Sequence, residues 1–214
     1  MKTIKLHNVV PNIFLSREDT ESDIWRTDVM FERGKSYLVE AESGTGKSSL
    51  CSFLFGQRGD YSGDILFDGE DVRKYSITRW SELRKSSIGV LFQDLKLFGE
   101  LTAMENVELK NNLTNTQNRQ TILHWFEELG ISDKLNVRID RMSYGQQQRV
   151  ALIRALCQPL DFLLLDEPIS HLDSRNSDIM RDILLRETER QGAAIIATSI
   201  GKHLDINYDK VLHL

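Results

Sequence analysis

The sequence predicts an α/β fold: a mostly parallel sheet with helices on both faces, an antiparallel β subdomain on the N-terminal side, and an inserted helical subdomain. Helix-like and strand-like segments alternate in the second half, at 144–157, 161–166, 174–191 and 193–198. A loop of small residues separates the apolar stretch 37–39 from the helix-competent stretch 49–54. The pattern across about 94–158 is helical and interrupts the alternation, so we expect 1–214 to be a single domain with a helical insertion.

Residues 3–40 are expected to form the antiparallel part. Apolar and polar residues alternate at Ile4-Lys5-Leu6 and, more loosely, from Trp25 to Phe31. The polar stretch from Ser16 to Asp23 is most simply a hairpin loop, and Gly34-Lys35 marks a turn before the next strand.

The segment between the small-residue loop and the insertion contains short elements. Residues 62–70 are expected to form a strand pair closed by Asp68-Gly69. Residues 80–85 have the pattern of a short helix, and residues 88–92 that of a buried strand.

Two helices are predicted inside the insertion. Thr102 is placed to cap the first, with Glu105 as its capping-box partner. The second runs from about Asn115 to Leu129 and stops at Gly130. The chain ends in an edge strand at 210–214.

The loop of small residues has the layout of a phosphate-binding P-loop, Ala41-Glu42-Ser43-Gly44-Thr45-Gly46-Lys47-Ser48. Small side chains let backbone N–H groups approach phosphate oxygens, and the following helix adds its positive N-terminal end. Lys47 would contact the β- and γ-phosphates, and the Ser48 hydroxyl would ligate Mg²⁺. Ala41 replaces the first glycine of G-x-x-x-x-G-K-[ST], which we expect the loop to tolerate. The alternative is an ordinary Gly/Ser turn between a strand and a helix.

A second part of the site is predicted where the apolar run 162–165 is followed by Asp166-Glu167-Pro168. Ligands of open parallel sheets bind at the carboxyl ends of the strands. Asp166 would hold Mg²⁺ through its water shell, and Glu167 would polarise an attacking water. The alternative is a simple strand-to-turn exit. Together the two motifs predict a P-loop NTPase core.

Further motifs resemble those of the ATP-binding-cassette (ABC) ATPases. Met142–Arg149 resembles the family signature L-S-G-G-Q-x-Q-R, Leu91-Phe92-Gln93 resembles the Q-loop, and Ile169–Asp173 resembles the D-loop. The stretch from Leu97 to Val107 also follows the family pattern, so the resemblance covers essentially the whole chain in the right order. Within the family, the chain is most similar to the lipoprotein-release, macrolide-export and cell-division group.

The resemblance implies a second copy of the chain as a partner, with two ATP molecules sandwiched between the copies. Ser143 would cap the helix that starts near Gly145 and form an anion site for the γ-phosphate held by the partner. The alternative is that Ser143 is an N-cap alone. The implied nucleotide-binding residues are Phe14, Ser43, Gly44, Thr45, Gly46, Lys47, Ser48, Ser49, Ser143, Gly145, Gln146 and Asp173. The implied Mg²⁺ ligands are Ser48, Gln93 and Asp166, and the implied catalytic residues are Glu167, Gln93 and Ser199.

Three positions depart from the family pattern or are hard to match to it. Tyr144 replaces the first glycine of the signature, which puts a ring near the expected dimer contact. Ser199 stands where the family usually has the switch histidine, so we expect slow or partner-dependent hydrolysis. His203 is four residues later and is more simply structural. The adenine-stacking aromatic is expected at Phe14, with Trp25 as the second candidate, although both also suit the core.

Composition and charge exclude several other classes. Among 214 residues, 40% are hydrophobic and 28% charged, and the longest apolar runs are far shorter than the roughly 20 residues that cross a bilayer. The first residues lack the apolar region of a secretion signal. A net charge of −5 does not indicate a nucleic-acid partner. Cys51 and Cys157 have no metal-binding or disulfide spacing, so we expect buried thiols in a reducing compartment.

The resemblance implies an ATPase subunit of an ABC transporter, using ATP and Mg²⁺. It would couple ATP-driven dimer closure to a separate integral-membrane permease and lie in the cytoplasm on the inner face of the membrane. Leu97 and Phe98 would lie near the partner's docking site. The alternative is an ATP-gated interaction module, in which hydrolysis only resets binding.

Overall fold

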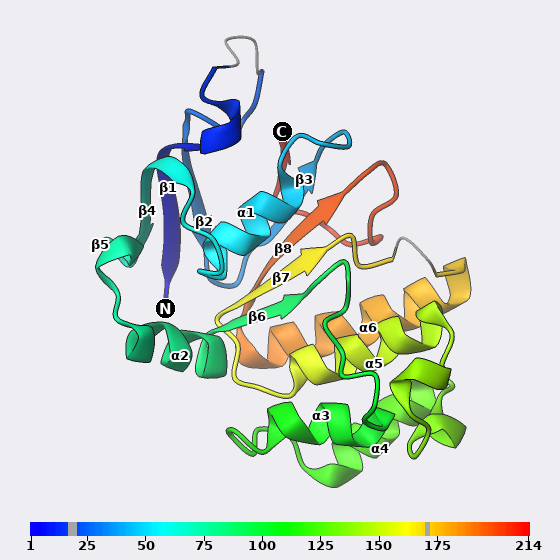
Figure 1. Cartoon of the computed structure of the whole chain (residues 1–214). Coiled ribbons are helices and arrows are strands. Elements are labelled where there is room, and N and C mark those ends of the chain that lie inside the picture. The colour runs from blue at the N-terminus through cyan, green and yellow to red at the C-terminus, as the bar shows by residue number, and fades with distance from the viewer. Residues whose placement is uncertain (17–20, 170–171) are drawn as a thin grey trace.

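The computed structural model describes residues 1–16, 21–169 and 172–214 and contains two sheets (Figure 1). The parallel sheet has the order β6-β7-β8-β3-β9. Its strands are β3 (Ser36–Glu40), β6 (Ile88–Leu91), β7 (Phe162–Asp166), β8 (Ala194–Ser199) and β9 (Lys210–His213). The antiparallel sheet has the order β2-β1-β4-β5, with β1 (Thr3–Pro11), β2 (Asp28–Glu32), β4 (Tyr61–Phe67) and β5 (Glu70–Asp71). The predicted fold class and the edge position of the last strand are confirmed.

The parallel sheet is buried on both faces: its central strands β7 and β8 are buried at every position and apolar until their last one or two residues. Leu163 and Leu165 of β7 pack into one core, whereas Phe162 and Leu164 pack into the other. This alternation follows from the two-residue period of a strand. The first core contains the helices α3 (Ala103–Asn111), α4 (Arg119–Glu128), α5 (Tyr144–Leu156) and α6 (Ser174–Gln191). The second contains α1 (Lys47–Leu54) and the antiparallel sheet, with α2 (Ile77–Ser86) at its border.

The inserted helices lie between β6 and β7 in the chain and below the parallel sheet in Figure 1. Thr102 caps α3 through the predicted capping box with Glu105. Phe126 on α4 and Val150 on α5 belong to the same apolar cluster as Leu163 of the sheet. The insertion therefore shares its core with the sheet. The division of the chain into one domain with an insertion at about 94–158 stays a prediction.

Several boundaries differ from the sequence-based expectation. The second helix of the insertion begins at Arg119, because Asn118 caps it by accepting a hydrogen bond from the Thr121 N–H. The strand expected from Trp25 begins at Asp28. The loop expected at 16–23 falls partly outside the described residues. Within the described part of the chain, no helix is long and apolar enough to cross a membrane.

Gly63 on β4 faces an irregularity in the neighbouring strand β1. The register shifts between His7 and Val10, and Asn8 there has a φ of +50°. Gly63 itself has a φ of +85°, and a Cβ at this position would lie 2.3 Å from the Asn8 carbonyl oxygen. Only glycine fits, because both the backbone conformation and the space exclude a side chain.

We therefore expect Gly63→Ala to lower the free energy of unfolding by about 2 kcal/mol or more. The matched control is Gly59→Ala, since a Cβ at Gly59 meets nothing within 4 Å. Urea denaturation of both variants measures the difference. Equal stability of the two variants would contradict the tight packing of β1 on β4.

Candidate functional site

The P-loop, Gln93 and the Asp166-Glu167 pair meet at one edge of the parallel sheet. Strands β3, β6, β7 and β8 are mutually parallel, so their carboxyl ends lie together. The P-loop follows β3, Gln93 follows β6, and the Asp166-Glu167 pair ends β7. These segments are far apart in the chain, and the sheet brings them together (Figure 1).

The P-loop takes its conformation from two glycines and the aromatic side chains behind it. Gly44 and Gly46 have φ values of +82° and +106°. A Cβ on Gly46 would lie 3.1 Å from ring atoms of both Phe14 and Trp25. The Trp25 Nε1–H donates to the Thr45 carbonyl at 2.9 Å, and this hydrogen bond anchors the P-loop backbone to the core.

Ala41 is tolerated because its position needs no left-handed backbone. It is absent from the described residues with positive φ. Its N–H donates to the Ser199 carbonyl at 3.1 Å, which ties the start of the loop to the end of β8. The backbone at Ala41 is therefore one that residues other than glycine adopt, and the expectation that the loop tolerates this replacement stays a prediction.

Lys47 begins α1 and is 6% exposed. Its ammonium donates to the Glu42 carbonyl at 2.8 Å and lies 3.9 Å from a Glu167 carboxylate oxygen. Carbonyl oxygens of the P-loop thus solvate the Lys47 charge, and the phosphate oxygens of a bound nucleotide would take their place. A buried ammonium at a helix N-terminus provides the positive field that phosphates require.

The two carboxylates at the end of β7 have different surroundings. Asp166 is 4% exposed and accepts a hydrogen bond from the Thr198 hydroxyl at 2.8 Å. Glu167 has a φ of +51°, a left-handed backbone conformation that is strained for a residue with a side chain. Its carboxylate accepts a hydrogen bond from the Gln93 Nε2 at 3.4 Å. Backbone strain of roughly 1–3 kcal/mol is typical of functional sites, and here it turns Glu167 towards Lys47 and Gln93.

Two hollows adjoin the P-loop, and Ser48 and Gln93 border both. The first has a volume of about 430 Å³ and is lined by Ile13, Phe14, Ser43, Gly44, Gly46, Lys47, Ser48, Ser49, Arg58, Gln93, Glu167 and Ile200. The second, about 520 Å³, is lined by Ser48, Ser52, Gln57, Phe92, Gln93, Asp94, Lys96, Tyr144 and Asp166. Both volumes fall in the range of small-molecule sites, about 300–1,000 Å³. Ser48, Gln93 and Asp166 supply oxygen atoms, the ligand type that Mg²⁺ prefers, so the residues present fit Mg²⁺ and a nucleotide.

The remaining predicted nucleotide-binding residues do not line these hollows. Thr45 uses its hydroxyl within the loop, donating to the Glu42 carbonyl at 2.9 Å. Ser143, Gly145, Gln146 and Asp173 are not among the lining residues of either hollow, although Tyr144, between the first two, lines the second. This placement is consistent with residues that act on the nucleotide of a second copy, which is how the family resemblance uses them.

Ser143 caps α5 as predicted. Its hydroxyl accepts a hydrogen bond from the Gln146 N–H, and the Gln146 side chain accepts one from the Ser143 N–H, which completes a capping box. Asp173 caps α6 in a similar way through Asn176. Two residues of the predicted D-loop, Ser170 and His171, lie outside the described residues.

Tyr144 contacts the Q-loop of its own chain. Its hydroxyl donates to the Gln93 carbonyl, and its ring lines the hollow that contains Ser48 and Asp166. Burial raises the pKa of this phenol, and the carboxylates of Asp94 and Glu167 add to the shift, so the hydroxyl stays a donor. The departure from glycine therefore joins the signature helix to the loop after β6.

Ser199 is oriented differently from the expectation. It is 1% exposed, and its hydroxyl donates to the Lys202 carbonyl at 2.6 Å, which closes its own loop. Ile200, 49% exposed, is the residue of this segment that lines the first hollow. A catalytic role for Ser199 gains no support from this orientation and stays a prediction. His203 lies 3.7 Å from a Glu40 carboxylate oxygen and edge-on to Tyr208, away from both hollows.

Both candidates for the base-stacking residue are mainly buried, and their role stays a prediction. Phe14 is 6% exposed and packs behind Gly46, and Trp25 is 3% exposed. Ile13 is 72% exposed and lines the first hollow beside Gly44. The first hollow therefore has an exposed aliphatic contact, Ile13, and a mainly buried aromatic one, Phe14, whereas Trp25 does not line it.

Sequence reasoning missed other residues that shape the site. Thr198 positions Asp166, and Arg58 lines the first hollow while donating to the Ser49 hydroxyl at 2.9 Å. Gln148 on α5 is 2% exposed and donates to the Pro168 carbonyl at 2.5 Å, which links the signature helix to the segment after Glu167. Gln148 belongs to the signature motif and Thr198 directly precedes Ser199, so both stood in recognisable patterns, whereas Arg58 reaches the site through long-range packing.

Substitutions distinguish the role of Ile13, which is exposed at the first hollow, from that of Phe14, which is mainly buried. We expect Phe14→Ala to lower the free energy of unfolding by about 3–5 kcal/mol, because it leaves a cavity behind the P-loop. We expect Ile13→Ala to change stability by less than about 0.5 kcal/mol but to weaken nucleotide binding about threefold to tenfold through lost apolar contact. Denaturation and calorimetric titration with ATP measure the two effects. A stably folded Phe14→Ala variant with the larger loss of affinity would contradict this assignment.

Known proteins with similar sequences belong to the family that this site indicates. A family model described as "ABC transporter" matches residues 26–170. The uncharacterized ABC transporter ATP-binding protein YbbA of Escherichia coli is 31% identical over 190 residues, which cover 87% of this chain and 83% of YbbA. The macrolide export ATP-binding/permease protein MacB of a Shewanella species is 31% identical over 85% of this chain. The match spans only 28% of the length of MacB.

A solved structure agrees with the fold. The dimeric bacterial ABC transporter cassette MJ0796 superposes with a TM-score of 0.78 at 25% identity, covering 92% of this chain and 87% of that cassette. The relatives include macrolide-export proteins, as the sequence resemblance indicated. The chain is therefore an ATP-binding cassette of the ABC transporter family.

Proposed function

We propose that this chain is the ATP-binding and hydrolysing subunit of an ABC transporter, and that it couples ATP-driven closure of a homodimer to a separate membrane subunit. The observation that carries the proposal is the position of Gln93. Its side chain contacts the Glu167 carboxylate, and its backbone carbonyl accepts the Tyr144 hydroxyl. One loop thus touches the reaction centre and the signature helix.

The residues divide the reaction between them. Lys47 and the P-loop N–H groups hold the phosphates, and Ser48 and Asp166 orient Mg²⁺, which neutralises charge on the phosphoryl group when bound. Glu167, held between Lys47 and Gln93, accepts a hydrogen bond from the attacking water and aligns it. Ser143 and the N-terminus of α5 face the nucleotide of the second copy, as in a sandwich dimer.

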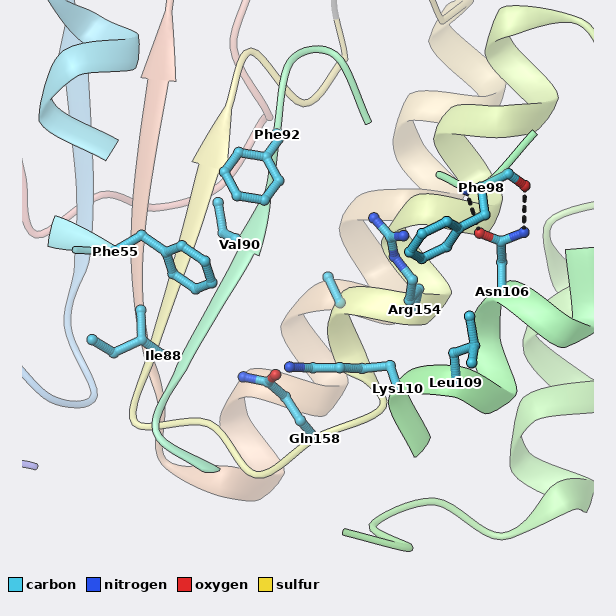
Figure 2. A pocket seen from close by; sticks show the side chains of 11 residues that line it. Phe55, Ile88, Val90, Phe92, Phe98, Asn106, Leu109, Lys110, Arg154 and Gln158 are labelled. Atoms are coloured by element: carbon cyan, nitrogen blue, oxygen red, sulfur yellow. Dashed lines mark hydrogen bonds between the residues drawn. The ribbon is translucent and has the colours of Figure 1, made fainter. Parts of the chain in front are cut away.

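An apolar pocket lies beside the same loop and is the proposed docking place of the membrane subunit. It has a volume of about 240 Å³ and lies between the edge strand β6 and the helices α3 and α5 (Figure 2). Phe98 and Leu109 at this pocket are 51% and 49% exposed. Exposed apolar side chains around a pocket favour a protein partner. Leu97, by contrast, is half-buried against the core.

The proposed location follows from the partner. Docked on a membrane subunit, the chain would lie in the cytoplasm as a peripheral protein of the inner membrane face. Its net charge of −5 disfavours a nucleic-acid partner.

A second candidate is an ATP-gated interaction module with slow hydrolysis. The observation that favours it is the Ser199 side chain, which is engaged with Lys202 and has no imidazole to offer the γ-phosphate. In this version ATP closes the dimer, the closed dimer holds the partner, and hydrolysis resets the complex.

The hydrolysis rate distinguishes the role of position 199. If Ser199 takes no part in the reaction, Ser199→Ala should keep the wild-type turnover within about twofold, whereas loss of a transition-state donor commonly costs about 10²–10³. Ser199→His should raise turnover if its thermal stability matches wild type. A large loss of turnover in Ser199→Ala would contradict the statement that Ser199 takes no part in the reaction. A wild type as fast as a stably folded Ser199→His would contradict slow hydrolysis. Steady-state phosphate release gives the rates.

The partner is tested with Glu167→Gln, which we expect to keep ATP bound and the dimer closed while turnover falls by about 10² or more. The variant is captured from detergent-solubilised native membranes with Mg²⁺-ATP, with Lys47→Ala as the nucleotide-free control. Mass spectrometry should find a co-purifying protein with transmembrane helices in the first sample only. Recovery of the self-dimer alone, or of soluble proteins, would count against the transporter and favour the interaction module.

A further inference from the structure

The turn after α1 brings a charged side chain to the P-loop. Residues 56–60 lie between α1 and β4, and the Gln57 N–H donates to the Ser52 carbonyl near the end of the helix at 2.8 Å. The chain reverses here, and Arg58 lines the first hollow. Of the described residues that line this hollow, Lys47 and Arg58 are the cations. Lys47 is assigned to the β- and γ-phosphates, whereas Arg58 has no assigned role.

Contacts on three sides hold the Arg58 guanidinium in one orientation. Its Nε donates to the Asp60 carboxylate at 2.9 Å, and its Nη2 donates to the other oxygen of the same carboxylate. Its Cζ lies over the Phe53 ring, 5.4 Å from the centroid. Its Nη1 donates to the Ser49 hydroxyl at 2.9 Å. A planar guanidinium that is already held in place loses little further freedom when a ligand binds beside it.

The hydrogen bond from Arg58 restricts where the Ser49 hydroxyl can donate. A serine hydroxyl has one proton and two lone pairs, and Arg58 occupies a lone pair. The proton therefore points away from Arg58, and no described residue accepts it. Ser49 is the third residue of α1, whose first internal hydrogen bond is from the Leu50 N–H to the Gly46 carbonyl. The Ser49 hydroxyl and N–H are thus both available to an anion in the first hollow.

Ser49 and Arg58 lie away from the proposed metal end of the site. Ser48 borders both hollows, and the second of these contains Asp166. Ser49 and Arg58 line the first hollow and not the second. Because Ser48 and Asp166 are the proposed Mg²⁺ ligands, Ser49 is directed at a phosphate other than the one that shares the metal with them.

The turn that carries Arg58 is joined to the side of the hollow where the base would bind. The Asp60 carbonyl accepts a hydrogen bond from the Asn12 N–H at 2.9 Å. The next residue, Ile13, is the exposed aliphatic contact of the first hollow. The phosphate closest to the base of a nucleotide is the α-phosphate, and P-loop N–H groups cradle the α- and β-phosphates. The position of Ser49 therefore fits the α-phosphate.

We propose that Arg58 is a positioning residue for the α-phosphate, and that it holds the Ser49 hydroxyl as a donor towards an oxygen of that phosphate. This inference rests on the proposed function, since it concerns the nucleotide that the ATPase binds. Arg58 acts by orientation rather than by charge, because the Asp60 carboxylate already pairs with its guanidinium. Without Arg58, the Ser49 hydroxyl rotates freely, and part of the gain from its bond to the phosphate is lost to ordering.

The test measures the affinity of the full chain for Mg²⁺-ADP by calorimetric titration, so that hydrolysis does not contribute. Arg58→Met should weaken binding about threefold to tenfold, the range expected for one hydrogen bond. Ser49→Ala should cause a similar loss. The double variant should bind no more than about twofold more weakly than Ser49→Ala alone, because Arg58 acts through that hydroxyl. Arg58→Lys keeps the charge without the planar fork and should not restore the affinity.

The matched control is Arg73→Met. The Arg73 side chain also pairs with a nearby aspartate, Asp71 at 3.3 Å, and its Cζ lies 5.9 Å from the centroid of the Tyr61 ring. It is about as exposed as that of Arg58, at 47% against 43%, and it lines neither hollow. Arg73→Met should leave the affinity for ADP unchanged. The melting temperature of each variant reports whether the cassette is folded.

The two diastereomers of ADP that carry sulfur on the α-phosphate locate the contact. Sulfur accepts a hydrogen bond more weakly than oxygen, so the isomer with sulfur facing Ser49 should bind less well. Wild type and Arg73→Met should prefer the same isomer, and Arg58→Met should reduce that preference about threefold or more. A purely structural role of Arg58 would weaken both isomers equally.

Three results would overturn this inference and leave the proposed function standing: an unchanged isomer preference in Arg58→Met, additive losses in the double variant with Ser49→Ala, or full affinity in Arg58→Lys. A folded wild type that binds neither ADP nor ATP would overturn both.

Discussion

The position of the Lys47 ammonium is the constraint on which the site depends. A charge that is 6% exposed must be solvated by the protein, and here the Glu42 carbonyl and the nearby Glu167 carboxylate do so. That solvation requires the left-handed glycines of the P-loop, the rings behind Gly46 and the backbone strain at Glu167. The same arrangement prepares the loop for phosphates, because the ligand exchanges one set of oxygens for another without moving the charge into an apolar region.

The two departures from the family pattern share a physical outcome. Tyr144 and Ser199 both direct their hydroxyls at backbone carbonyls of their own chain, at Gln93 and Lys202. The first bond ties α5 to the loop after β6, and the second closes the loop after β8 on itself. The cassette in this state therefore holds its Q-loop and the end of β8 through internal contacts, which the proposed dimer closure would have to break or accommodate.

Much of the fold and the centre of the site followed from local patterns. The P-loop and the Asp166-Glu167 pair are short, contiguous and bounded by strands, so the parallel sheet places them. The caps at Thr102 and Ser143 were also readable, since a cap involves residues only three positions apart. What the patterns left open is which way a side chain turns. Phe14 and Ile13 are adjacent, and packing against Gly46 decides which of them is buried. The apolar pocket beside β6 depends on residues from four separate segments, and no local pattern reports such a meeting.

The core shared by the inserted helices and the sheet restricts how this cassette can change. Because Phe126 and Val150 pack in the same cluster as Leu163 and Ile195, the insertion has no separate interior of its own. Any displacement of the helices during the ATP cycle must be a small sliding of packed surfaces, since a hinge opening would expose that cluster to water. In evolutionary terms, the insertion is not a module that can be exchanged by recombination. A transplanted copy would have to bring matching residues on the face of the sheet with it, so the two parts must diversify together.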